Sequence, residues 1–146
     1  MAETLGSLCD KLTIVKLKQY HSDDKDKLNS LAKQEIQLKE EIDGFLNNAI
    51  SGVIAPERLI FSANKVYKSE GNKPREVIGK IGEVFAILAR VNCELWHEQE
   101  KVYEFEKVAP QQKDEVIKKL ALLNLERNNC IDSIDMQLQA LISAKP

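Results

Sequence analysis

The chain has 146 residues and a formal net charge of -2, with 21 Lys and Arg against 23 Asp and Glu. This length matches one domain with a single buried core, so we predict one domain over residues 1–146. The balanced charge gives no field that attracts a polyanion, and the basic residues are interspersed with acidic ones. We therefore expect no DNA binding.

The start of the chain and its cysteines indicate where the protein resides. Met1 to Thr4 lacks the features of a signal peptide, and no apolar run approaches the roughly 20 residues that span a bilayer. We expect a cytoplasmic protein that makes no contact with a membrane. Cys9, Cys93 and Cys130 form no C-x-x-C pair, which predicts reduced and partly buried thiols. A reactive thiol, the alternative, would need a basic neighbour.

The first predicted element is a long amphipathic helix. From Thr4 to about Leu46, apolar residues recur at steps of three and four. The polar stretch from Tyr20 to Lys27 interrupts this stripe, and Ser22 or Asp23 there could cap a new helix. The sequence therefore predicts either one continuous, bent helix or a break within this stretch.

Beyond the first helix, glycine, asparagine and proline signals divide the chain into three further helices. The turn at Glu70–Pro74 is the clearest of these signals, and Ala109-Pro110 marks the end of the next helix. The expected helices run from Pro56 to about Lys68, from Arg75 to about Lys107, and from Gln111 to about Ile142.

These elements predict an all-α fold. No segment alternates polar and apolar residues over enough positions to indicate a strand. Long helices joined by short turns pack as antiparallel neighbours, so we predict an antiparallel bundle of three long helices plus one short helix. Helices of this length overhang a monomeric core. We therefore expect a second copy to cover the apolar ends, in a homodimer or a larger assembly.

Two segments of the sequence resemble each other. A shift of 76 residues along the chain aligns Leu5-Gly6 with Ile81-Gly82 and Tyr20-His21 with Trp96-His97, so the only two histidines of the chain coincide. A duplicated helical hairpin would explain this and would make a pseudo-symmetric bundle. Chance likeness between two apolar stripes is the alternative, and we favour duplication.

Polar side chains on or beside the apolar stripes indicate a binding site, because burying them costs free energy unless each finds a partner or a ligand. The candidate ligand-binding residues are Asp10, Lys11, His21, Arg90, Asn92, Trp96, His97, Arg127, Asn128, Asp132 and Asp135. Lys11, Arg90 and Arg127 would hold an anion, while the Asn, Asp and His side chains would bind hydroxyls or a base edge. Trp96 could stack on a base. The alternative is a structural network that fixes helix register.

Two carboxylate patterns suggest metal chemistry. Glu94-x-x-His97 has the spacing of di-iron bundles, but the matching Lys18-x-x-His21 lacks the carboxylate. Glu40-x-x-Asp43 and Asp132-x-x-Asp135 superficially match the magnesium-binding pairs of helical nucleotide pyrophosphohydrolases, without a second acidic pair nearby. We therefore expect no metal, no cofactor and no catalytic residues. A metal-dependent phosphohydrolase is kept as an alternative.

Two stretches resemble a known family. LGSLCDKLTIVKLKQYH at Leu5–His21 and ERNNCIDSID at Glu126–Asp135 are similar to domain of unknown function 4254, a small helical family of bacteria and phages. The likeness covers most of the chain and is loose between Gly44 and Pro74. It implies a site at the matching positions, which are Asp10, Lys11, His21, Arg127, Asn128, Asp132 and Asp135. Tyr20 replaces the Trp of the family pattern, and the resemblance implies no established activity.

The preferred interpretation is a non-enzymatic, homo-oligomeric bundle that holds a small anionic ligand in its polar seam. A nucleotide, a signalling nucleotide or a nucleotide-sugar would fit, and a phage protein of this kind could sequester its ligand. The first alternative is a structural or adaptor protein that acts through helix-face contacts with another protein. The second is the metal-dependent nucleotide phosphohydrolase.

Overall fold

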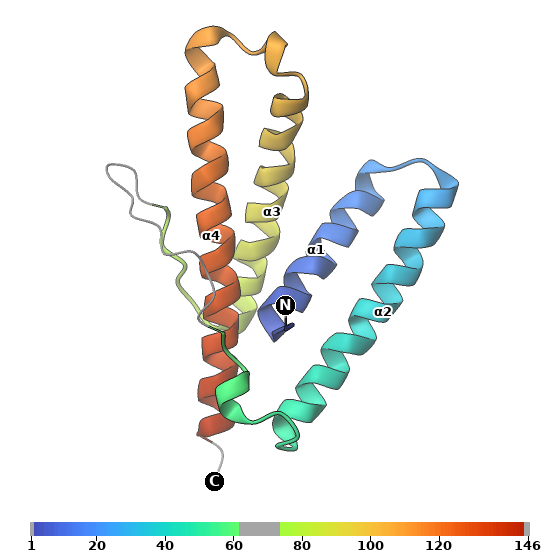
Figure 1. The fold of residues 1–146 in the computed structure, drawn as a ribbon, viewed down its shortest axis with the longest axis vertical. Helices are drawn as coiled ribbons and strands as arrows, with labels where there is room; N and C mark the ends of the chain where they lie inside the picture. The colour runs from blue at the N-terminus through green and yellow to red at the C-terminus, as the bar shows by residue number, and fades with distance from the viewer. Residues whose placement is uncertain (1, 62–73, 145–146) are drawn as a thin grey trace.

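The computed structural model describes residues 2–61 and 74–144. Its helices are α1 (Leu5–His21), α2 (Lys25–Ile50), α3 (Ile81–Tyr103) and α4 (Pro110–Ser143), with the 3-10 turns η1 (Pro56–Arg58) and η2 (Phe105–Lys107). Figure 1 shows two antiparallel hairpins, α1 with α2 and α3 with α4. The described residues contain no strand, which confirms the all-α prediction. None of the described helices is long and apolar enough to cross a bilayer.

The first predicted helix is in fact two. Ser22 has an extended backbone, with φ of -109° and ψ of 140°, and ends α1. Asp24 then caps α2 by accepting hydrogen bonds from two backbone N–H groups of the first turn. A continuous helix from Thr4 to Leu46 is therefore wrong, and the alternative of a break is confirmed. The cap is Asp24, rather than Ser22 or Asp23.

The third long helix starts later than the sequence predicts. α3 begins at Ile81 instead of Arg75. Gly79 has a φ of +129°, which is incompatible with a helix. Arg75, which precedes this glycine, is bound to α4, because its backbone N–H and its guanidinium both donate to Glu126. At its other end α3 stops at Tyr103, and the 3-10 turn η2 takes the place of the predicted last turn.

The short predicted helix is also different. Where a helix was predicted from Pro56 to Lys68, the described part of the chain forms only the 3-10 turn η1, followed by the fully buried Leu59. The remainder of that predicted helix, and the turn predicted before Pro74, lie outside the described residues. α4 agrees closely with the predicted helix from Gln111 to Ile142.

The core lies where the two hairpins meet, at the end that holds the start of α1 (Figure 1). Its buried side chains are Leu5, Cys9, Ala49, Leu59, Val84, Leu88, Cys130, Ile134 and Leu138. Toward their turns the hairpins diverge, and α3 and α4 extend beyond α1 and α2. Consequently α1 packs against all three other helices, whereas α2 packs mainly against α1.

The cysteines lie in or near this core. Cys9 and Cys130 are buried, Cys93 is half-buried, and all three are free thiols. Burial raises the pKa of both Cys9 and Cys130 to about 11. These two thiols therefore stay protonated near neutral pH, which argues against the reactive-thiol alternative for them.

Candidate functional site

A buried polar network joins α1, α3 and α4. Asp10 of α1 is 4% exposed and accepts two hydrogen bonds from Arg127 of α4, one of them 2.8 Å from Nε to Oδ1. Asn92 of α3 donates from Nδ2 to Asp10 Oδ1 at 2.9 Å and to Thr13 Oγ1 at 2.7 Å. The Thr13 hydroxyl donates to the Asp10 carbonyl at 2.7 Å. Three of the predicted site residues, Asp10, Asn92 and Arg127, are thus in direct contact.

This network holds the Arg127 guanidinium in one orientation. The hydrogen bonds to Asp10 raise the pKa of Arg127 above its usual value, so the group stays charged. Asp10 occupies only the Nε and Nη2 donors, and Nη1 has no hydrogen-bond partner among the described residues. One third of the side chain is exposed. Arg127 therefore retains charged donors for a further acceptor.

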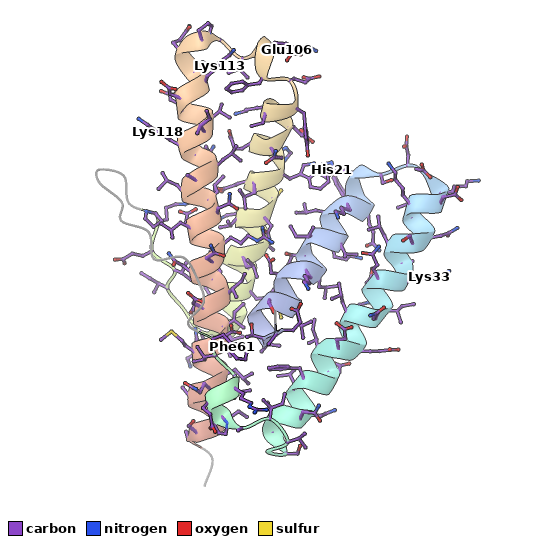
Figure 2. All side chains as sticks on the ribbon, viewed as in Figure 1. His21, Lys33, Phe61, Glu106, Lys113 and Lys118 are labelled. Carbon is purple, nitrogen blue, oxygen red and sulfur yellow. The ribbon has the colours of Figure 1, made fainter. Side chains whose placement is uncertain are left out.

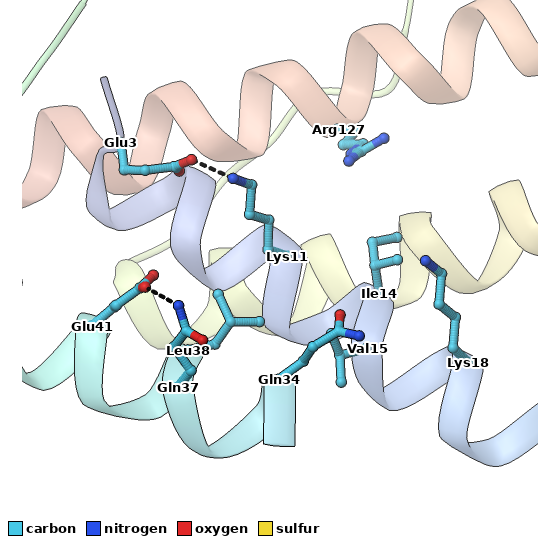
Figure 3. A pocket seen from close by; sticks show the side chains of 10 residues that line it. All are labelled: Glu3, Lys11, Ile14, Val15, Lys18, Gln34, Gln37, Leu38, Glu41 and Arg127. Atoms are coloured by element: carbon cyan, nitrogen blue, oxygen red, sulfur yellow. Dashed lines mark hydrogen bonds and ion pairs between the residues drawn. The ribbon is translucent and has the colours of Figure 1, made fainter. Parts of the chain in front are cut away.

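Arg127 lines a groove of about 540 Å³ that lies over α1. Figure 3 shows that α1 provides its centre, α2 one side and Arg127 of α4 the other side. Its lining residues are Glu3, Lys11, Ile14, Val15, Lys18, Gln34, Gln37, Leu38, Glu41 and Arg127. Ile14, Val15 and Leu38 give the groove an apolar floor, and charged or amide side chains form its rim.

The charges in this groove are unequally neutralised. Lys11 forms an ion pair with Glu3, and Gln37 donates from Nε2 to Glu41 at 3.0 Å. Lys18 forms no hydrogen bond or ion pair within the described parts of the chain. The groove thus contains a lysine without a counter-ion and the partly exposed Arg127, both of which can donate to an anion, while the carboxylate of Glu41, whose partner Gln37 is neutral, lies on the α2 side.

A second hollow, of about 610 Å³, continues the groove toward the turn between α1 and α2, and the two share Lys18 and Gln34. His21, which Figure 2 shows at the end of α1 beside α3, lines this hollow together with Trp96. Their rings are stacked, with centroids 4.8 Å apart and planes 10° apart. Tyr20 and His97 meet His21 edge-on at 5.2 Å and 6.1 Å. The two aromatic-His pairs of the internal repeat therefore touch each other.

Arg90 lies apart from this site. Its side chain is more than half exposed and lies 3.9 Å from Glu94, on its own helix. Glu94 also binds Arg75 at 2.6 Å. The predicted anion-holding trio is therefore reduced to Lys11 and Arg127 in the groove, while Arg90 belongs to the Arg75 ion-pair cluster.

The acidic residues predicted on α4 take other places. Asp135 is 4% exposed and its Oδ1 accepts a hydrogen bond from the Gly6 N–H at 2.7 Å, which ties α4 to the first turn of α1. Burial raises the pKa of Asp135 to about 6, against the lowering effect of this hydrogen bond. Asp132 lines a separate hollow along α4, and Asn128 is half-buried on the same helix. Asp135 therefore contacts the start of α1, and none of the three residues lines the groove.

The carboxylate pairs do not converge on a metal position. In the parts of the chain that the structure describes, no group of three or more His, Cys, Asp or Glu side chains is arranged to hold an ion. Glu94 is engaged with Arg75, and His97 lies beside Glu100, with 4.0 Å between Nδ1 and Oε2. Glu40 and Asp43 are exposed on α2.

Sequence analysis missed Lys18, Gln34 and Gln37 as site residues. Lys18 follows Lys11 after two helical turns and precedes His21 by one turn, so helical spacing alone could have placed these three side chains on one face. The two glutamines could not be found in this way. They reach the groove only because α2 folds back along α1.

Comparisons with known proteins add no relative. A scan against models of protein families matches none, and searches of curated proteins and of solved structures find no match. The resemblance to domain of unknown function 4254 therefore stays a prediction.

Proposed function

We propose that this protein is a non-enzymatic binding protein that holds a small anionic ligand in the groove over α1. The main support for this proposal is the position of the Arg127 guanidinium. Its guanidinium is held by a buried carboxylate and keeps free donors at the wall of a groove that also contains the unpaired Lys18. A guanidinium that is already oriented binds phosphate or carboxylate with little further loss of conformational entropy.

The lining of the groove indicates the class of ligand. Its volume lies within the usual range for small-molecule sites, roughly 300 to 1,000 Å³. Gln34 and Gln37 offer amide donors and acceptors for hydroxyl groups, and the apolar floor suits the carbon framework of a sugar. A nucleotide, a signalling nucleotide or a nucleotide-sugar combines these features, so the proposed ligand belongs to that class.

In this proposal the protein acts as a homodimer or a larger assembly in the cytoplasm. Large apolar side chains that are more than half exposed support a second copy, and they include Ile36, Ile50, Ile78, Met136 and Leu141. The three free thiols fit the reducing conditions of the cytoplasm.

The direct test of the groove is the loss of one charge from it. Thermal-shift screening and calorimetry with nucleoside phosphates, cyclic nucleotides and nucleotide-sugars would first identify a binding nucleotide. Lys18→Gln should then weaken its binding roughly 10- to 100-fold, since a hydrogen bond to a charged group contributes about 1.5–3 kcal/mol.

Lys33→Gln is the matched control, because Lys33 is exposed on α2 and is not among the residues that line the groove (Figure 2). It removes the same charge from the same hairpin and should leave the affinity unchanged. Equal weakening by both substitutions would show that only net charge matters. Absence of binding across the whole panel would reject the proposal and favour the adaptor alternative.

A further inference from the structure

We infer that the hollow bounded by His21 and Trp96 is a second subsite, which binds the planar nitrogen heterocycle of the ligand whose anionic group lies in the neighbouring groove. This inference rests on the proposed function, because the groove must supply the anion site. It adds to the proposed function the place where the base of such a nucleotide lies and a preference for a base that carries an amino group.

The groove and the second hollow are continuous. Lys18 lines both hollows, and His21 follows it by one helical turn on the same face of α1. Along the helix axis, Lys11 and His21 are about 15 Å apart at 1.5 Å per residue. A lone phosphate would occupy only the part near Lys18 and Arg127, whereas an elongated molecule could reach the rings at the far end.

The rings of His21 and Trp96 are arranged to stack on a further planar group. His21 and Trp96 come from different helices, and their near-parallel stack already forms a layered aromatic surface at the wall of the hollow. The indole Nε1 of Trp96 donates to Glu100 at 2.8 Å, which fixes the ring orientation. A third planar ring can extend such a stack with little rearrangement, and every nucleobase has a face suited to it.

The second hollow also contains carboxylates. Asp23 and Asp24 line it together with Lys27, and Lys18 lies at its junction with the groove. Asp24 is engaged in capping α2, but Asp23 has no hydrogen-bond or ion-pair partner in the described residues. Its carboxylate can accept from an exocyclic amino group. The site therefore favours a base that carries an amino group, such as adenine, over uracil.

The experiment uses Trp96 as its own reporter, since it is the only tryptophan in the chain. The full chain is titrated with AMP, UMP, ribose 5-phosphate and inorganic phosphate, and binding is followed by calorimetry and by tryptophan fluorescence. We expect AMP to quench Trp96 and to bind at least tenfold more tightly than ribose 5-phosphate, which should leave the fluorescence unchanged.

Two failures are distinguishable in this experiment. Equal affinities for AMP and ribose 5-phosphate, with no change in fluorescence, would overturn the base subsite and leave the anion groove standing. Absence of binding by all four compounds would overturn both the groove and the subsite.

Two substitutions test the subsite itself. Trp96→Leu should weaken AMP at least tenfold without affecting ribose 5-phosphate, and Tyr103→Leu is its control, because Tyr103 is 78% exposed on the same helix. Asp23→Asn, in the exposed turn, should abolish the preference for AMP over UMP without perturbing the core. Unchanged AMP affinity in Trp96→Leu, or an unchanged preference in Asp23→Asn, would contradict the inference.

Discussion

Asp135 is an ionisable group enclosed between the first turn of α1 and the last half of α4. Burial raises its pKa from 3.8 to about 6, although the Gly6 N–H and the Thr4 side chain act in the opposite direction. The folded state therefore holds this proton more tightly than the unfolded state does. Its contribution to stability is complete below about pH 4 and is lost as the pH rises through 6.

The corresponding prediction concerns Asp135→Asn. The amide keeps an acceptor for the Gly6 N–H but does not ionise. A rise of about two units in the pKa of this carboxyl corresponds to about 3 kcal/mol. The unfolding free energy of the variant relative to the wild type should therefore increase by roughly 1 to 3 kcal/mol between pH 4 and pH 7. Urea unfolding at both pH values measures this gain. If the unfolding free energies of the two proteins depended on pH in the same way, ionisation of Asp135 would cost the folded state no stability.

Arg127 has a structural role as well as a proposed binding role. Because Asp10 is almost fully buried, Arg127→Ala leaves a carboxylate without its counter-ion, and the unfolding free energy should fall by about 3–5 kcal/mol. Lys11→Ala removes only an exposed ion pair and should cost less than about 1 kcal/mol. Urea titrations compare the two, and similar small losses would mean that the Asp10 network is unimportant.

At the scale of elements, α1 and α4 approach each other closely at Gly6. A Cβ there would lie 2.5 Å from the carbonyl oxygen of Ile131 and 2.9 Å from Asp135 Oδ1. Backbone cannot yield as a flexible side chain does, so α1 and α4 would have to separate. Only glycine allows the Asp135 hydrogen bond and the core packing together.

Gly6→Ala should therefore destabilise the protein by at least about 1–3 kcal/mol, the usual cost of overpacking. Gly82, its partner in the internal repeat, offers a matched control, because a Cβ there would meet nothing within 4 Å. Gly82→Ala should instead stabilise α3 by up to about 1 kcal/mol. Thermal unfolding of both variants checks this contrast, and equal destabilisation would mean that α1 and α4 are not in close contact.

The sequence predicted helices more reliably than their ends. α4 has a regular stripe with a proline at its start, and its bounds were close. The break between α1 and α2 was ambiguous, because apolar residues on both sides fit one helical period. The late start of α3 accompanies the positive φ of Gly79, and the segment before it binds α4 through Arg75 and Glu126, a contact between residues far apart in sequence that no local pattern contains.

The candidate site was predictable only in part, because some of it is formed by contacts between helices that no local pattern contains. Buried polar residues on apolar stripes indicated Asp10, Asn92 and Arg127, and their contact is the centre of the network. Lys18 was missed because an exposed lysine beside a stripe looks like ordinary surface. Its significance comes from the groove, which exists only once α2 has folded back on α1.

For the whole molecule, we expect association through the exposed apolar side chains of α2 and α4. A homodimer would have twice the mass of the 16.5 kDa chain in light scattering or sedimentation. Met136→Lys should weaken association, because Met136 is 59% exposed and the substitution places a charge among the exposed apolar side chains of α4. A single species of one chain mass at high protein concentration would contradict this expectation.

The contacts between α1 and α4 also set an order of events during synthesis. Asp10 and Arg127 are separated by 117 residues, and Gly6 and Asp135 by 129. At roughly 5–20 residues per second, translation delivers Arg127 about 6 to 23 s after Asp10. Throughout this interval the Asp10 carboxylate is hydrated instead of paired with arginine, so the packing of α1 against α4 can form only after α4 has been synthesised, well after α1 and α2 can pair.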